Sequence, residues 1–186
     1  MPVPEIFYSS ETNGLISECT ICNKELLESN ELYFIEKGIK NYPNSGKTDV
    51  IFEYAICETC MENMRKSISE ESLERISKYM FEKIDFNSRM QRLFSQQEVK
   101  PDDWTSSCIV KNTNKETLDE YQVMCQCYGR EAVFSLFPYM IGGEALEEIQ
   151  NLLSKKTKEE LDGFYDKYLG PSPEIKELFK TKVLII

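Results

Sequence analysis

The chain of 186 residues contains no histidine. Histidine is the commonest acid–base residue in enzymes and the usual partner of an activated serine or cysteine nucleophile. The sequence therefore excludes Ser-His and Cys-His catalytic pairs. Carboxylates and lysines remain available, but the composition favours a protein that is not an enzyme.

Long apolar runs are also missing. No segment approaches the roughly eighteen apolar residues of a membrane-spanning helix, and residues 1–5 lack the basic and apolar regions of a secretion signal. We therefore expect a soluble, cytoplasmic protein with no membrane partner. Residues 183–186 are apolar but too few for an anchor. They are expected to pack as an edge strand or over a core, or to bind a partner if they are exposed.

Positive charge is scarce, since 22 basic residues face 32 acidic ones and the net charge is −10. Because nucleic acids are strongly negative, this balance disfavours them and favours another protein as the partner. One alternative stays open, in which basic and aromatic side chains gather on a single positive face that binds nucleic acid. The simpler interpretation is scattered solubilising charge. The residues concerned are Lys37, Lys40, Lys47, Arg65, Lys66, Arg75 and Lys78, with Tyr33, Phe34 and Tyr42.

The chain has seven cysteines, an odd number that excludes a complete disulfide framework. Four of them form two C-x-x-C pairs. Two residues between thiols let both sulfurs of a pair reach one ion, and two pairs complete the tetrahedron that Zn²⁺ prefers. Four thiolates leave no position for a catalytic water, so we predict one structural zinc ion. Its ligands, called here the cysteine tetrad, are Cys19, Cys22, Cys57 and Cys60.

Cys108, Cys125 and Cys127 remain outside this set. Free cysteine is among the most buried residue types, which favours a core position for all three. A second zinc ion would need a fourth ligand from a carboxylate, water or another chain. A thiol redox enzyme would need a lowered thiol pKa, for which the sequence offers no evident helix N-terminus.

In the first half, β-branched and aromatic segments at 31–37 and 49–56 flank turn-forming residues and predict a β-hairpin. A helix is expected to begin at the second cysteine pair. Ser69 is a candidate N-cap for the next helix, which has apolar residues at helical spacing up to Ile84. Residues 87–97 are expected to extend it or to form another helix. We place a domain boundary after this helix, between residues 98 and 99. It separates a zinc-binding module over 1–98 from a second module over 99–186.

The second half repeats this order of elements. Segments 121–127 and 132–137 predict another hairpin, 144–153 predicts an amphipathic helix, and Thr157 with Glu160 has the form of a capping box for a further helix that Gly170 and Pro171 end. The fold class is therefore α+β.

An internal duplication accounts for this parallel order. Residues 19–31 can be laid without a gap on 108–120, and 68–76 resembles 141–149. The second copy would lack the metal, since Lys111 stands in the place of Cys22 and Phe137-Pro138 lies near the place of the second pair. A hydrophobic cluster is then expected to replace the ion.

The order of knuckle, hairpin and helix over residues 19–66 resembles the treble-clef group of zinc fingers. The resemblance implies the cysteine tetrad as ligands and, because the group is diverse, no particular activity. We predict a non-catalytic zinc-binding protein with a protein-interaction or adaptor role. The alternatives are a nucleic-acid-associated regulator and a thiol redox enzyme that uses Cys125 and Cys127.

Overall fold

A computed structural model describes residues 1–43, 45–95 and 100–169 of the chain. Within them, five antiparallel strands form one sheet in the order β2-β1-β3-β4, with β5 also paired to β3. The strands are β1 (Leu32–Tyr42), β2 (Lys47–Cys57), β3 (Glu120–Tyr128), β4 (Glu131–Ala132) and β5 (Tyr139–Gly142). The predicted mixture of helices and strands is confirmed.

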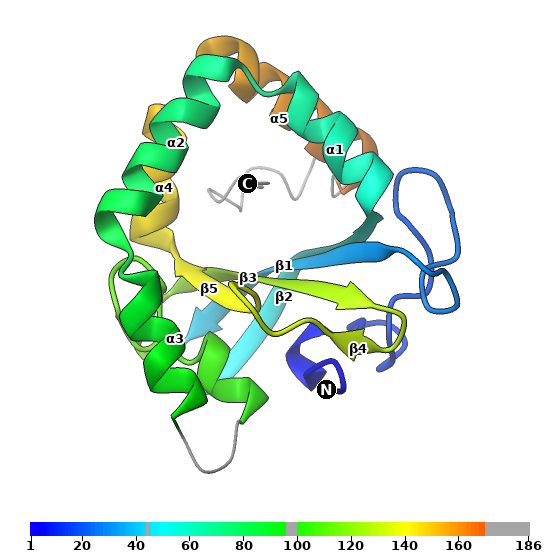
Figure 1. The fold of residues 1–186 in the computed structure, drawn as a ribbon, viewed down its shortest axis with the longest axis horizontal. Helices are drawn as coiled ribbons and strands as arrows, with labels where there is room; N and C mark the ends of the chain where they lie inside the picture. Colours follow the sequence, from blue (N-terminus) through cyan, green and yellow to red (C-terminus); the bar gives the residue numbers. More distant parts are fainter. Residues whose placement is uncertain (44, 96–99, 170–186) are drawn as a thin grey trace.

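Five α-helices accompany the sheet in the described part of the chain. They are α1 (Glu58–Ser67), α2 (Glu70–Lys83), α3 (Phe86–Phe94), α4 (Gly143–Leu152) and α5 (Lys155–Tyr168). Figure 1 shows α1 beside α5 and α2 beside α4, with both pairs rising from the sheet and meeting far from it. The N-terminal segment lies near the opposite face. None of these helices is long and apolar enough to cross a membrane.

The predicted first hairpin is confirmed, with strands longer than the segments that predicted it. Its close pairing needs a glycine at position 38, because a Cβ atom there would lie 2.3 Å from Cε1 of Phe52. The register shifts directly after Gly38. At the tip, Gly46 adopts a left-handed φ of 64°, which glycine tolerates without strain.

The second hairpin differs from the prediction. Only Glu131 and Ala132 pair with β3 as β4, and the chain then leaves the sheet before β5 returns to pair with β3. Pro138 stands just before β5 and has no N–H for a ladder. The predicted strand over 132–137 is therefore wrong beyond its first residue, and β5 was missed.

Strands β1 and β3 join the two halves of the chain. Their continuous antiparallel ladder runs from the pair of Leu32 with Tyr128 to the pair of Lys40 with Glu120. Several predictions concern positions outside the described residues. They are the end of the helix predicted over 87–97, the domain boundary at 98/99, the helix stop at Gly170-Pro171 and the apolar segment 183–186.

Helix caps decide where α2 and α5 begin. The hydroxyl of Ser69 accepts a hydrogen bond from the N–H of Ser72, which confirms it as the N-cap of α2. For α5 the cap is Ser154, whose hydroxyl accepts from the N–H of Thr157. The predicted capping box starting at Thr157 is wrong, because an earlier serine already holds the first turn.

Candidate metal centre

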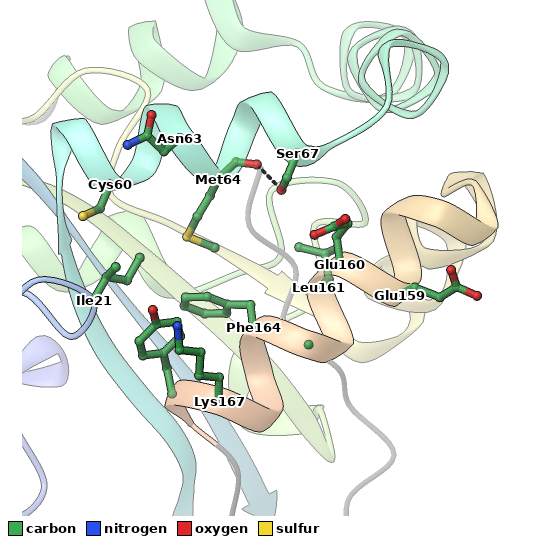
Figure 2. Close-up of a pocket in the computed structure, with 12 residues that line it drawn as sticks. Ile21, Cys60, Asn63, Met64, Ser67, Glu159, Glu160, Leu161, Phe164 and Lys167 are labelled. Atoms are coloured by element: carbon green, nitrogen blue, oxygen red, sulfur yellow. Dashed lines mark hydrogen bonds between the residues drawn. The ribbon is translucent and has the colours of Figure 1, made fainter.

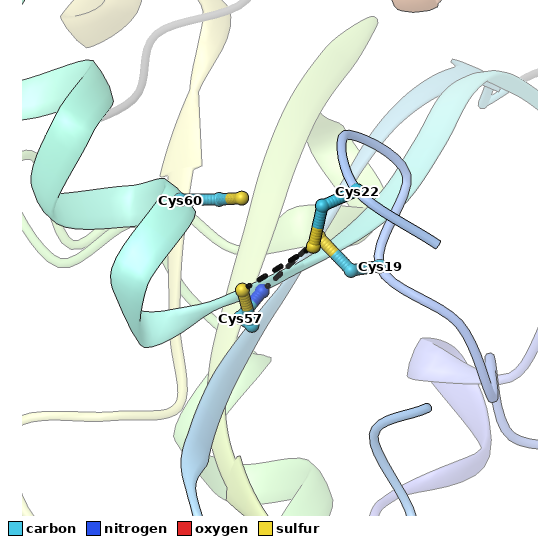
Figure 3. A group of neighbouring side chains, drawn as sticks. All are labelled: Cys19, Cys22, Cys57 and Cys60. Carbon is cyan, nitrogen blue, oxygen red and sulfur yellow. Dashed lines mark hydrogen bonds between the residues drawn. The ribbon is translucent and has the colours of Figure 1, made fainter. Parts of the chain in front are cut away.

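The fold brings the cysteine tetrad together (Figure 3). Its four sulfur atoms all lie within 4.8 Å of one another. The thiols of Cys22 and Cys57 are 3.8 Å apart. Three of the four residues are buried and Cys22 is exposed. All four are free thiols, so the cluster is a set of converging donors and not a disulfide pair.

The first pair sits on a tight turn. The N–H of Cys19 donates to the carbonyl of Lys24, and the N–H of Asn23 donates to the carbonyl of Cys19, both at 2.8 Å. Asn23 has a left-handed φ of 58°, which asparagine tolerates better than most residues. This turn lets two sulfurs point the same way from one short loop.

The second pair stands where a strand becomes a helix. β2 ends at Cys57, and α1 carries Cys60 in its first turn. The N–H of Thr20 donates to the carbonyl of Ala55 at 2.8 Å and holds the first turn against β2. The N–H of Cys57 also points to the Cys19 sulfur at 3.5 Å. Backbone hydrogen bonds therefore fix how the two pairs face each other.

The backbone also favours thiolate at one ligand. Burial by itself raises the pKa of the Cys19 thiol, but N–H groups of Cys57, Cys22 and Ile21 outweigh it and lower the pKa to about 7. Burial raises the pKa of Cys57 and of Cys60. A divalent cation reverses this second effect, because its charge favours deprotonated thiols.

The donor set fits one metal ion. A tetrahedral zinc tetrathiolate with bonds of about 2.3 Å places its sulfurs ~3.8 Å apart, close to the spacing of Cys22 and Cys57. Four cysteines are thus positioned to bind one metal ion. With every position taken by sulfur, such an ion could brace the fold but could not activate water.

The other three cysteines are all buried. Among the described residues they belong to no group of three or more convergent ligands. Cys125 and Cys127 have sulfurs 3.5 Å apart inside the sheet, and the neighbouring thiol together with burial raises the pKa of Cys125. Cys108 accepts hydrogen bonds from the N–H groups of Lys111 and Gly142. These contacts are those of packed core thiols and disfavour redox reactivity.

The proposed positive face does not assemble on the hairpin. Lys37 is 4% exposed, and its ammonium contacts Glu53 at 3.0 Å and the carbonyl of Tyr8 at 2.6 Å. Tyr33 is fully buried. On α2, Arg75 and Lys78 each pair with a glutamate one turn away. Three of the seven basic residues of this face are therefore paired with glutamates.

An ion-pair cluster that the sequence did not predict joins the turn at 108–113, called here the second knuckle, to α4. The ammonium of Lys111 contacts Glu144 at 3.1 Å and forms a shorter pair with Glu148. Glu148 also accepts a hydrogen bond from the hydroxyl of Tyr79. The clue in the sequence was a lysine at the place of a cysteine, but its partners come from a distant helix.

The chain matches none of the protein-family models, curated proteins or solved structures with which it was compared. Fold and function are therefore inferred from the geometry of this chain alone.

Proposed function

We propose that the protein is a non-catalytic zinc-binding protein whose single zinc ion is structural. The observation that carries this proposal is the convergence of the four tetrad sulfurs within 4.8 Å. Zinc suits an all-sulfur tetrahedral donor set better than the harder divalent cations do. The missing histidine and the closed donor set both argue against a catalytic metal.

The ion would tie the N-terminal knuckle to the junction of β2 and α1, with a separation of 35 residues between Cys22 and Cys57. Structural zinc contributes roughly 10 to 16 kcal/mol to small modules. A whole domain is stable by only about 5 to 15 kcal/mol. Metal binding would therefore decide whether this part of the chain folds.

We further propose that residues 19–66 form a treble-clef-like unit and that the second half is a degenerate copy without metal. Support comes from the backbone of the second knuckle. There the N–H of Cys108 donates to the carbonyl of Thr113, and the N–H of Asn112 donates to the carbonyl of Cys108. Both bonds are 2.8 Å long, as are the two equivalent bonds of the first knuckle. Asn112 has a φ of 56°. In addition, α1 and α4 each have 10 residues, and α2 and α5 each have 14, so the helices correspond in this order and not in the order suggested by the alignment of 68–76 with 141–149.

In this comparison the ion-pair cluster of Lys111, and not the hydrophobic cluster expected from the sequence, takes the place of the metal. The N–H of Gly142 points to the Cys108 sulfur as that of Cys57 points to Cys19. Gly142 and Ala145, and not Phe137-Pro138 as the sequence suggested, then occupy the places of Cys57 and Cys60. Ion pairs join the second knuckle to α4. We also propose that the two copies correspond to modules 1–98 and 99–186. The modules would meet where β1 pairs with β3.

The interaction role needs a surface, and a groove beside the metal centre offers one. A cavity of about 480 Å³ runs between α1 and α5, lined by Met64, Leu161 and Phe164 among others, with Glu159 and Glu160 also in its lining (Figure 2). Lys167 also lines the groove, but the two glutamates leave its lining net negative. We therefore propose that the groove receives an apolar segment of another protein that carries basic residues.

Metal analysis tests the zinc proposal directly. We expect one zinc per purified chain by elemental analysis, with the four tetrad thiols protected from alkylation until a chelator is added. A protein without metal whose tetrad thiols alkylate at once would overturn it.

Peptide selection on the zinc-loaded chain tests the groove. Selected peptides should be apolar with basic flanks and should lose binding to Met64→Lys but not to Lys66→Gln, on the same helix. Peptides that bind both variants equally would contradict the groove as the docking site.

A further inference from the structure

A second cavity, of about 290 Å³, lies between the α2–α3 junction and the second knuckle, among residues outside the tetrad. Its lining is rich in groups that can donate hydrogen bonds. They are Lys83, Ser88, Arg89, Arg92, Ser107 and Asn112. Three of the six are cations, in a chain with a net charge of −10.

Arg89 is the unusual member of this lining. Arg89 is only 7% exposed. One terminal nitrogen of its guanidinium donates to the carbonyls of Trp104 at 2.8 Å and Pro138 at 3.1 Å. The Nε atom is buried without an acceptor. The guanidinium carbon lies 5.5 Å from the centre of the Trp104 ring. The carbonyls and the ring orient the cation but supply no negative charge.

A buried cation without a counter-ion is costly, since its charge is poorly solvated. Across the described residues, Arg89 has no ion pair, and neither have its neighbours Lys83 and Arg92. Burial, and secondarily the charge of Arg92, lowers the pKa of Arg89 to about 10, so it stays protonated at neutral pH.

Asp85 is the acidic residue in the cavity lining. Its two oxygens accept hydrogen bonds from the N–H of Ser88 at 2.9 Å and from its hydroxyl at 2.6 Å, because Asp85 is the N-cap of α3. Its carboxylate is committed to that cap. One acid against three cations leaves the cavity positive.

We propose that this cavity, defined by Arg89, Arg92 and Lys83, binds a small oxyanion, above all a phosphate group. A guanidinium presents several N–H donors in a plane that suits tetrahedral and planar oxyanions, and hydroxyl and amide groups at Ser107 and Asn112 can complete the shell. The volume is at the lower end of small-ligand pockets, so the ligand is a free anion or a small phosphorylated molecule.

The test is titration of the full zinc-loaded chain with inorganic phosphate, sulfate and glycerol phosphate, followed by calorimetry or NMR. We expect saturable binding that weakens with added salt. Arg92→Gln and Lys83→Gln should each reduce affinity by about tenfold, because each removes a charged donor. Both residues are exposed, so these variants should fold.

Arg75→Gln is the matched control, since Arg75 is an exposed cation of α2 outside the cavity that is already paired with Glu71. It should bind phosphate as the unchanged chain does. Tighter binding of glycerol phosphate than of phosphate would identify a phosphorylated molecule as the ligand, and the reverse would identify the free anion. No saturable binding at millimolar concentrations, or binding that both cavity variants retain, would overturn the proposal.

Discussion

The side-chain hydroxyls of Ser69 and Ser154 lie 3.0 Å apart where the α1–α2 turn crosses the α4–α5 turn. Each serine also caps the helix that follows it. The bonds across the crossing are reciprocal, since the N–H of Ser69 donates to the hydroxyl of Thr157 and the N–H of Ser154 donates to that of Ser72. The two helical turns therefore hold each other at a point remote from the sheet.

Replacing Ser154 tests the importance of this crossing. Ser154→Ala removes the N-cap of α5 and the contact with Ser69 together, so we expect a loss of about 1 to 2 kcal/mol in the free energy of unfolding. Urea denaturation of the zinc-loaded protein measures it. Ser10→Ala, at an exposed serine far from the crossing, serves as control. A loss no greater than that of the control would mean that the crossing contributes little.

Removing one tetrad thiol should uncouple the knuckle from α1. Cys57→Ser is expected to abolish stoichiometric zinc binding and to lower helix content and melting temperature, because the remaining three thiols leave the ion an open and weaker site. Elemental analysis and circular dichroism measure both effects. Cys108→Ala, at a buried cysteine outside the tetrad, should still bind one zinc. Full zinc content in Cys57→Ser would contradict the four-ligand assignment.

The proposed duplication can be tested by restoring a metal site in the second half. A chain with Lys111→Cys, Gly142→Cys and Ala145→Cys, together with native Cys108, should bind a second zinc. The added Cβ at position 142 would lie 2.8 Å from a methyl carbon of Leu118, a flexible side-chain end that can move aside. Two zinc ions per chain would support equivalent knuckles.

Lys111→Cys alone is the matched control for that experiment and should leave the zinc content at one per chain, because two thiols do not complete the tetrahedron. If the triple variant folds and still binds one zinc, the two halves do not share the ligand geometry that the duplication requires.

Glu36 should make stability depend on pH. It is 2% exposed, and its carboxyl oxygen accepts a hydrogen bond from the hydroxyl of Tyr54. Burial raises its pKa to about 8, against the opposing effect of that hydrogen bond. The folded state thus holds the proton more tightly than the unfolded one. Stability from this group is full below the unfolded pKa near 4.5 and is lost as pH rises toward 8.

The measurement is the difference in unfolding free energy between Glu36→Gln and the unchanged chain, which cancels the pH dependence of zinc binding. Relative to that of the unchanged chain, the unfolding free energy of the variant should rise by about 1 to 3 kcal/mol between about pH 6 and pH 8.5. Glu62→Gln, at an exposed glutamate of α1, should show no such trend. A difference that stays constant with pH would mean that Glu36 is already ionised in the folded protein.

Features that depend on residues close together in the chain could be predicted from the sequence. The C-x-x-C spacing predicted which thiols would share a turn, and Ser69 predicted the start of α2, because both depend on the geometry of a few consecutive residues. The first hairpin followed in the same way from alternating β-branched and aromatic residues around a turn.

Features that depend on partners distant in the chain became visible only in the folded structure. Lys37 is a surface cation by its residue type, but Glu53 and the carbonyl of Tyr8 hold it inside. Lys111 contacts glutamates on α4, and Arg89 donates to the carbonyls of Trp104 and Pro138, 15 and 49 residues away in the sequence. The environment of a charged side chain is set by the groups that the fold packs around it. The pattern of residue types along the chain does not identify those groups.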